Sequence, residues 1–85
     1  MTRAHMWEAR AADGRAAELE RWVRETALPA LRPAAPVRSE VFTADGGRVL
    51  LITWWPGEPA AVPDPPDGLL ARPVHRWSFT STYVE

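Results

Sequence analysis

The sequence predicts a single α+β domain, residues 1–85, in which one main helix covers one side of a four-stranded antiparallel sheet. Three observations lead to this prediction. Several segments alternate in hydropathy or are rich in β-branched and aromatic residues, as strands are. One segment has helical periodicity and lies between the first and second of these strands. The strand at 49–55 is apolar on both faces, which is typical of a central strand with a layer packed on each side.

The first strand and the helix occupy the N-terminal third of the chain. Residues 4–12 place apolar side chains among charged neighbours and are expected to form the first strand. Residues 15–28 are expected to form the helix, because apolar side chains recur there at spacings of three and four. This apolar stripe consists of Ala16, Leu19, Trp22, Val23, Thr26 and Ala27. Pro29 is expected to end or kink the helix, because proline lacks an N–H group and its ring clashes with the preceding turn.

The second and third strands are predicted to form a hairpin. Residues 37–44 alternate between apolar and polar side chains, which favours a half-buried strand. An Asp-Gly-Gly sequence at 45–47 is a strong signal for the turn, and residues 49–55 form the returning strand. One face of that strand reads Val49, Leu51, Thr53 and Trp55, and the other reads Leu50, Ile52 and Trp54. Both faces therefore need to be covered.

The remaining third of the chain contains one short helical turn and the last strand. Five prolines between residues 56 and 66 exclude a regular helix there. A single helical turn from Pro65 through Leu70 is expected in place of a second helix. Residues 74–84 form the last strand, whose two faces alternate. One face consists of His75, Trp77, Phe79, Ser81 and Tyr83.

This order of elements fits the split βαββ(α)β plan, also called ferredoxin-like, in which strands 1 and 3 occupy the centre of the sheet. Right-handed crossovers put the helical layer on one side of the sheet and leave the other side bare. A chain of 85 residues with one good helix supplies a single covering layer. It contains no cysteine, so disulfides cannot compensate for a small core. We therefore expect a homodimer formed through the sheets.

Charge and composition narrow the range of partners. The formal net charge is −1, which provides no electrostatic basis for binding nucleic acid or an anionic membrane. No apolar run approaches the roughly 20 residues of a membrane span, and the first residues lack the apolar core of a signal peptide. The sequence therefore predicts a soluble, cytoplasmic protein with no nucleic-acid or membrane partner.

The chain resembles the dimeric α+β barrel superfamily, specifically the small proteins related to antibiotic-biosynthesis monooxygenases. The resemblance is carried by residues 6–10 (MWEAR) with the helix that follows, by the strand at 49–55 and by residues 75–79 (HRWSF). It implies a homodimer with two sheets packed face to face, and a pocket in each subunit between sheet and helical layer. The superfamily includes cofactor-independent oxygenases of polycyclic aromatics. Their early-strand Asn has no counterpart here, because this chain contains no Asn.

Four aromatic residues are the candidates for a ligand-binding pocket. They are Trp7, Trp54, His75 and Trp77. The tryptophans would stack on a flat ligand, or they would serve as core and interface residues. His75 would move a proton to or from a phenolic ligand, or it would hydrogen-bond a loop carbonyl. His5 and His75 are expected at opposite ends of the sheet, and no cluster of metal-ligand type exists, so neither a metal nor a cofactor is predicted.

Two hypotheses for the function remain open at this point. The first is a non-catalytic homodimer of uncharacterised role, which the missing Asn favours. The second is a monooxygenase-like or binding protein for an aromatic or polyketide-like small molecule. The residues leave open whether the protein is an enzyme, because fold alone does not determine activity.

Overall fold

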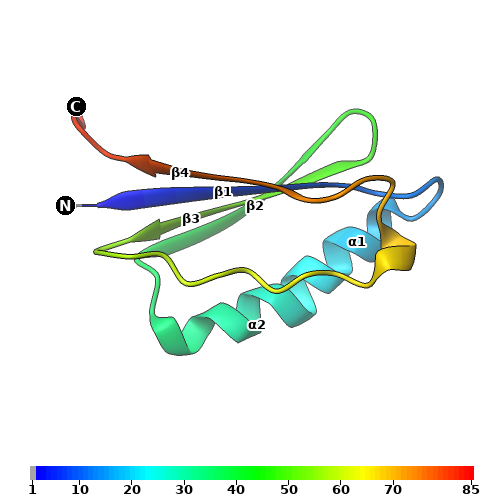
Figure 1. Ribbon diagram of the computed structural model, residues 1–85, viewed down its shortest axis with the longest axis horizontal. Helices are drawn as coiled ribbons and strands as arrows, with labels where there is room; N and C mark the ends of the chain where they lie inside the picture. Colours follow the sequence, from blue (N-terminus) through cyan, green and yellow to red (C-terminus); the bar gives the residue numbers. More distant parts are fainter. Residues whose placement is uncertain (1) are drawn as a thin grey trace.

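The computed structural model describes residues 2–85 as a four-stranded sheet with the helical layer on one side (Figure 1). Its strands are β1 (Arg3–Arg10), β2 (Arg38–Ala44), β3 (Arg48–Trp55) and β4 (His75–Thr80). Neighbouring strands are antiparallel, in the order β2-β3-β1-β4. The α+β prediction with the first and third strands in the centre is therefore confirmed. This order is compatible with a ferredoxin-like fold.

The helix is longer than predicted and passes through Pro29. It consists of α1 (Ala16–Trp22), the π-helical segment η1 (Val23–Ala27), α2 (Leu28–Leu31) and the 3₁₀ turn η2 (Arg32–Ala34). Of the two alternatives expected at Pro29, an end or a kink, the end is wrong, because helical structure continues to Ala34. The backbone N–H of Leu28 bonds to the carbonyl of Val23, five residues earlier, so the helix is wider just before the proline. A wide turn gives room for a ring that would otherwise clash with the carbonyl four residues earlier.

The core lies between this helix and the sheet. Trp7 from β1 is fully buried, and its ring stacks on that of Trp22 with the ring centroids 6.2 Å apart. The other core residues alternate along the strands or follow the helical stripe, as period-two and period-3.6 patterns require. They are Ala9, Leu19, Val23, Ala27, Leu31, Val49, Leu51 and Trp55, with Ala11, Val62 and Leu69 from the connecting segments.

The proline-rich segment takes the place of a second helix. It runs along the same side of the sheet as the helix (Figure 1), and Val62 from its middle is buried in the core. The predicted single turn is present as the 3₁₀ helix η3 (Asp67–Leu69), and Leu69 is also buried. Two apolar side chains and a short turn thus cover the area that a longer helix would cover.

The hairpin turn is confirmed, whereas two strand ends differ from prediction. Gly46 and Gly47 have positive φ angles of 82° and 73°, a conformation that glycine adopts without strain. β4 ends at Thr80 rather than at 84, because Thr80 already pairs with Arg3, the first residue of β1. Beyond Thr80 the N–H of Ser81 still donates to the Thr2 carbonyl at 2.9 Å, and no further strand pairing follows within residues 2–85. β1 ends at Arg10 rather than at 12, where the chain turns toward the helix.

Candidate functional site

The side of the sheet opposite the helix carries no covering element from residues 2–85, and we call it the open face (Figure 1). The registers of the strand pairs show which side chains share it, because directly paired residues point to the same side. Across β2, β3, β1 and β4 they form three rows. These rows are Arg38–Trp54–Ala4–Phe79, Glu40–Ile52–Met6–Trp77 and Phe42–Leu50–Glu8–His75.

Most of the open face is apolar. Trp77 and Phe79 on β4 are 42% and 51% exposed, and Phe42 on β2 is also exposed. The side chains of the two central strands are half-buried between these edges. Large aromatic side chains exposed together on one surface are unusual for a monomer and mark interaction or ligand-binding surfaces.

A groove of about 570 Å³ lies on the β2 side of the open face. It is lined by Thr2, Val37, Arg38, Glu40, Phe42, Ile52 and Trp54. The Arg38 guanidinium lies 5.5 Å from the centre of the Trp54 ring and pairs with Glu40 at 2.6 Å. The groove therefore combines an apolar floor with a charged pair at its rim, which suits a flat ligand with a polar edge.

A cluster of charges occupies the other end of the open face, around Glu8. The Glu8 side chain is only 12% exposed, although it carries a carboxylate, which is normally solvated. Arg72 Nη2 donates to Glu8 Oε1 at 2.8 Å, and Arg48 Nη1 lies 3.6 Å from Glu8 Oε2. His75 Nδ1 lies 3.5 Å from Glu8 Oε1, and the His75 ring meets Trp77 edge-on. These partners compensate the loss of hydration of the carboxylate.

The helix-facing side of the sheet holds two buried polar groups near one another in sequence. His5 Nδ1 and Trp7 Nε1 are buried and have no hydrogen-bond partner among residues 2–85. Burial lowers the pKa of His5, and the nearby positive charge of Arg76 lowers it further. Arg76 is held there by the Val62 carbonyl at 2.8 Å and by Asp64 at 2.7 Å.

The structure brings three of the four predicted site residues to the same side of the sheet. Trp54, His75 and Trp77 are on the open face, in three different rows. Trp7 is fully buried on the helix-facing side, so it is separated from the other three by the sheet itself. A role of these residues in ligand binding stays a prediction.

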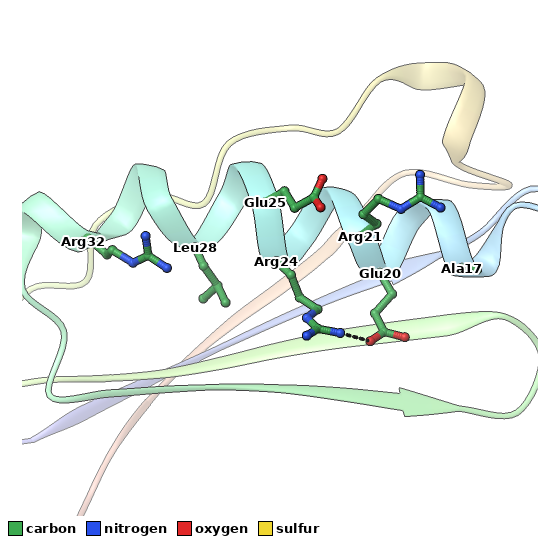
Figure 2. A pocket seen from close by; sticks show the side chains of 7 residues that line it. All are labelled: Ala17, Glu20, Arg21, Arg24, Glu25, Leu28 and Arg32. Carbon is green, nitrogen blue, oxygen red and sulfur yellow. Dashed lines mark hydrogen bonds and ion pairs between the residues drawn. The ribbon is translucent and has the colours of Figure 1, made fainter.

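The space between helix and sheet, where the resemblance implies a pocket, is filled by the buried aromatic and aliphatic side chains of the core. A surface groove along the helix is lined mainly by charged side chains, with Ala17 and Leu28 among them (Figure 2). Arg24 pairs with Glu20 there at 3.5 Å, one helical turn apart, and both side chains are exposed to solvent. Such a pair is worth a few tenths of a kcal/mol, about 0.3–0.5, and is ordinary for a solvated helix face.

The sequence did not reveal the cluster around Glu8. Arg72 comes from the loop before β4, 64 residues away from Glu8, and no periodicity links the two. The one available signal was the position of Glu8 on the same strand face as Met6, which places a carboxylate next to an apolar side chain. Arg48 could be placed beside it only once the register of β1 and β3 was known.

The described part of the chain contains no group of three or more metal-ligating side chains, and none of its helices is long and apolar enough to cross a membrane. No family model matches the chain, and no curated protein or solved structure matches it. The suggested superfamily therefore rests on the pattern of elements alone.

Proposed function

We propose that the protein works as a homodimer in which the open faces of two copies pack against each other, and that it has no catalytic role of its own. The observation that carries this proposal is the apolar surface on the side of the sheet that the helix leaves uncovered. Ile52 and Trp54 of the central strand β3 lie in it, between exposed aromatics on both edge strands. A central strand that is apolar on both sides is typical of a sheet packed on both sides.

The size of the open face suits a second copy of the chain. Four strands about 4.8 Å apart and about seven residues long, at about 3.3 Å per residue, present a flat area of roughly 450 Å². The relief of the side chains makes the accessible area larger than this flat area. It is then of the order of the ~800 Å² per partner that a standard protein interface buries. A two-fold axis would pair the same surface on both copies, so no second kind of surface is needed.

Two substitutions on neighbouring residues of β3 test the dimer. Ile52 is on the open face and Leu51 is fully buried against the helix. We expect Ile52→Asp to yield a folded monomer, because the charge would be buried only in the dimer. Leu51→Asp is expected to unfold the protein, because it buries an unpaired charge in the core. Thr43→Asp, at an exposed position on the helix-facing side of β2, is the matched control. It is expected to change neither the folding of the protein nor its dimerisation.

The measurement is the solution mass by light scattering over a dilution series, with circular dichroism to monitor folding. A wild-type protein that is a folded monomer at micromolar concentrations would contradict the proposal. A dimer that persists in Ile52→Asp would contradict the assignment of the open face as its interface, even if the protein is dimeric.

The groove over Trp54 favours a second candidate function, which is the binding of a flat aromatic molecule. Its volume of about 570 Å³ is in the range of small-molecule sites. We expect a hydroxynaphthalene to quench tryptophan fluorescence in the wild type, and Trp54→Ala to weaken the binding at least about tenfold. Trp22→Phe, which changes a tryptophan on the other side of the sheet, is the control. Equal affinity in Trp54→Ala would exclude the groove as the binding site.

A further inference from the structure

Three arginine side chains gather at the end of the open face next to the β2–β3 hairpin. Arg10 and Arg48 are directly opposite each other in the β1–β3 ladder, and both are exposed. Alternation along β1 puts Arg10 on the same side of the sheet as Glu8. Like charges directly opposite in an antiparallel pair destabilise the sheet, so this pairing has a cost in the isolated chain.

The third guanidinium, that of Arg72, increases the charge imbalance. Among residues 2–85, Glu8 is the only carboxylate within 4 Å of a side-chain nitrogen of Arg48 or Arg72, and none lies that close to Arg10. Three positive charges therefore face one negative charge. Each guanidinium has five N–H donors, so one carboxylate leaves most of these donors without an anionic acceptor.

This charged end borders directly on apolar surface. In the row of Glu8 the neighbour on β3 is Leu50, and the next row contains Met6 and Trp77. The exposed ring of Trp77 is one row away from Glu8, which the guanidinium groups of Arg48 and Arg72 contact. It is two rows away from the row in which Arg10 and Arg48 pair. A ligand that spans both parts would need an anionic group and an apolar body next to it.

We propose that this end of the open face binds an organic acid, with its carboxylate on Arg10 and Arg48 and its apolar body on Met6 and Trp77. Guanidinium and carboxylate groups match in shape and charge and form paired, charge-assisted hydrogen bonds. An incoming carboxylate would also relieve the repulsion between the two opposed arginines. The site is built from one chain, so this inference goes beyond the proposed dimer. Because Met6 and Trp77 also belong to the open face that the dimer would bury, the ligand is expected to compete with dimerisation.

The binding of 2-naphthoate, followed by amide chemical shifts in an NMR titration, tests the proposal. Two control compounds each lack one half of the ligand. 2-Naphthalenemethanol has no charge, and inorganic phosphate has no apolar body. We expect 2-naphthoate to bind at least about tenfold more tightly than either, with shift changes centred on Arg10, Arg48 and Trp77. Equal affinity for inorganic phosphate, or for the uncharged alcohol, would overturn the assignment of an organic acid.

Two substitutions with opposite expected effects separate binding from general damage to the fold. Arg10→Gln removes a guanidinium while leaving the ion pairs of Glu8 intact, and it should weaken 2-naphthoate binding about fivefold or more. Glu8→Gln removes the competing carboxylate and should strengthen the binding. Arg24→Gln changes an exposed arginine of the helix, outside both proposed binding sites, and is expected to leave the affinity unchanged. Equal affinities in the wild type and Arg10→Gln would contradict the proposal. A loss of affinity in Arg38→Gln alone would also contradict it, because it would place the ligand in the groove over Trp54.

Discussion

His5 is a single residue that makes the stability of the fold depend on pH. It is a central-strand residue on the helix-facing side, where only 8% of its surface is exposed. A buried imidazole costs little while it is neutral, whereas taking up a proton would bury a charge. Burial and the positive charge of Arg76 both disfavour the charged form, so the folded protein holds the pKa of His5 below its usual value of 6.5.

This lowered pKa gives a definite sign to the dependence of stability on pH. In the unfolded chain His5 takes up a proton near pH 6.5, whereas in the folded chain it does so only at lower pH. The unfolded state therefore binds more protons as the pH falls below about 6.5, and the free energy of unfolding decreases. We expect the midpoint temperature of thermal unfolding to decrease when the pH is lowered from 7.5 to 5.5. His5→Gln is expected to make this decrease smaller.

Thermal melts of both proteins, followed by circular dichroism across this pH range, provide the measurement. The difference between wild type and variant isolates His5 from the carboxylates, which both proteins share. An identical dependence on pH in the two proteins would show that His5 does not contribute to it.

At the scale of the elements, the helix shows where tertiary packing overrode a local signal, which was the proline at position 29. The helix continues beyond Pro29 because a π-helical segment precedes the proline, and Leu31 at its end is buried against the sheet. Tertiary packing of that residue favours a helix that the proline alone would disfavour. The π-helical segment is the local adjustment that lets the helix contain Pro29 and still bury Leu31.

The turn of the β2–β3 hairpin depends directly on glycine. Gly47 has a φ of 73°, and a Cβ atom there would be no closer than 3.6 Å to any neighbour. The expected effect of Gly47→Ala therefore comes from the backbone conformation rather than from a clash. We expect a loss of about 1–2 kcal/mol in the free energy of unfolding, because this conformation costs L-residues that amount.

Gly57→Ala is the matched control for this substitution. Gly57 has no positive φ and open space around its Cα, so the change is expected to be neutral or slightly stabilising. Urea denaturation of both variants gives the two free energies of unfolding. A Gly47→Ala variant as stable as the wild type would show that the turn adopts another conformation in solution.

At the scale of the whole molecule, the chain has a covered side and an uncovered side. The helix and the proline-rich segment fill one side of the sheet, and the exposed aromatic residues of the strands, Phe42, Trp77 and Phe79, lie on the other. If two copies associate through that side, association and folding are thermodynamically linked, because the dimer exists only in the folded state.

This linkage makes the thermal stability depend on the protein concentration. We expect the midpoint of unfolding of the wild type to rise as the concentration is raised over two orders of magnitude, for example from about 1 to about 100 μM. Ile52→Asp is expected to abolish this dependence, because it removes the association but not the fold. Differential scanning calorimetry at several concentrations measures it. A wild-type midpoint that is independent of concentration would contradict association through the open face.

Hydropathy was sufficient to assign most of the fold. The alternating segments, the helical stripe and the Asp-Gly-Gly turn each reflect a local rule, and the doubly apolar strand at 49–55 indicated a central position for β3. Less of the candidate site could be predicted. Trp54, His75 and Trp77 were proposed as ligand-binding residues from residue type and strand face, and that role stays a prediction. Glu8 was not recognised as the centre of a charged cluster.

What the sequence alone determined about this protein is thus its pattern of elements, because hydrogen bonding and side-chain alternation act within short segments. The tertiary structure alone decided which face of each strand meets the helix. It placed Trp7 in the core and Trp77 on the open face, and it brought Arg72 to Glu8 across 64 positions of the sequence. These outcomes depend on the register between β1, β3 and β4, and a shift by one residue would exchange the two faces. Register depends on packing between segments that are distant in sequence, so no local pattern reveals it.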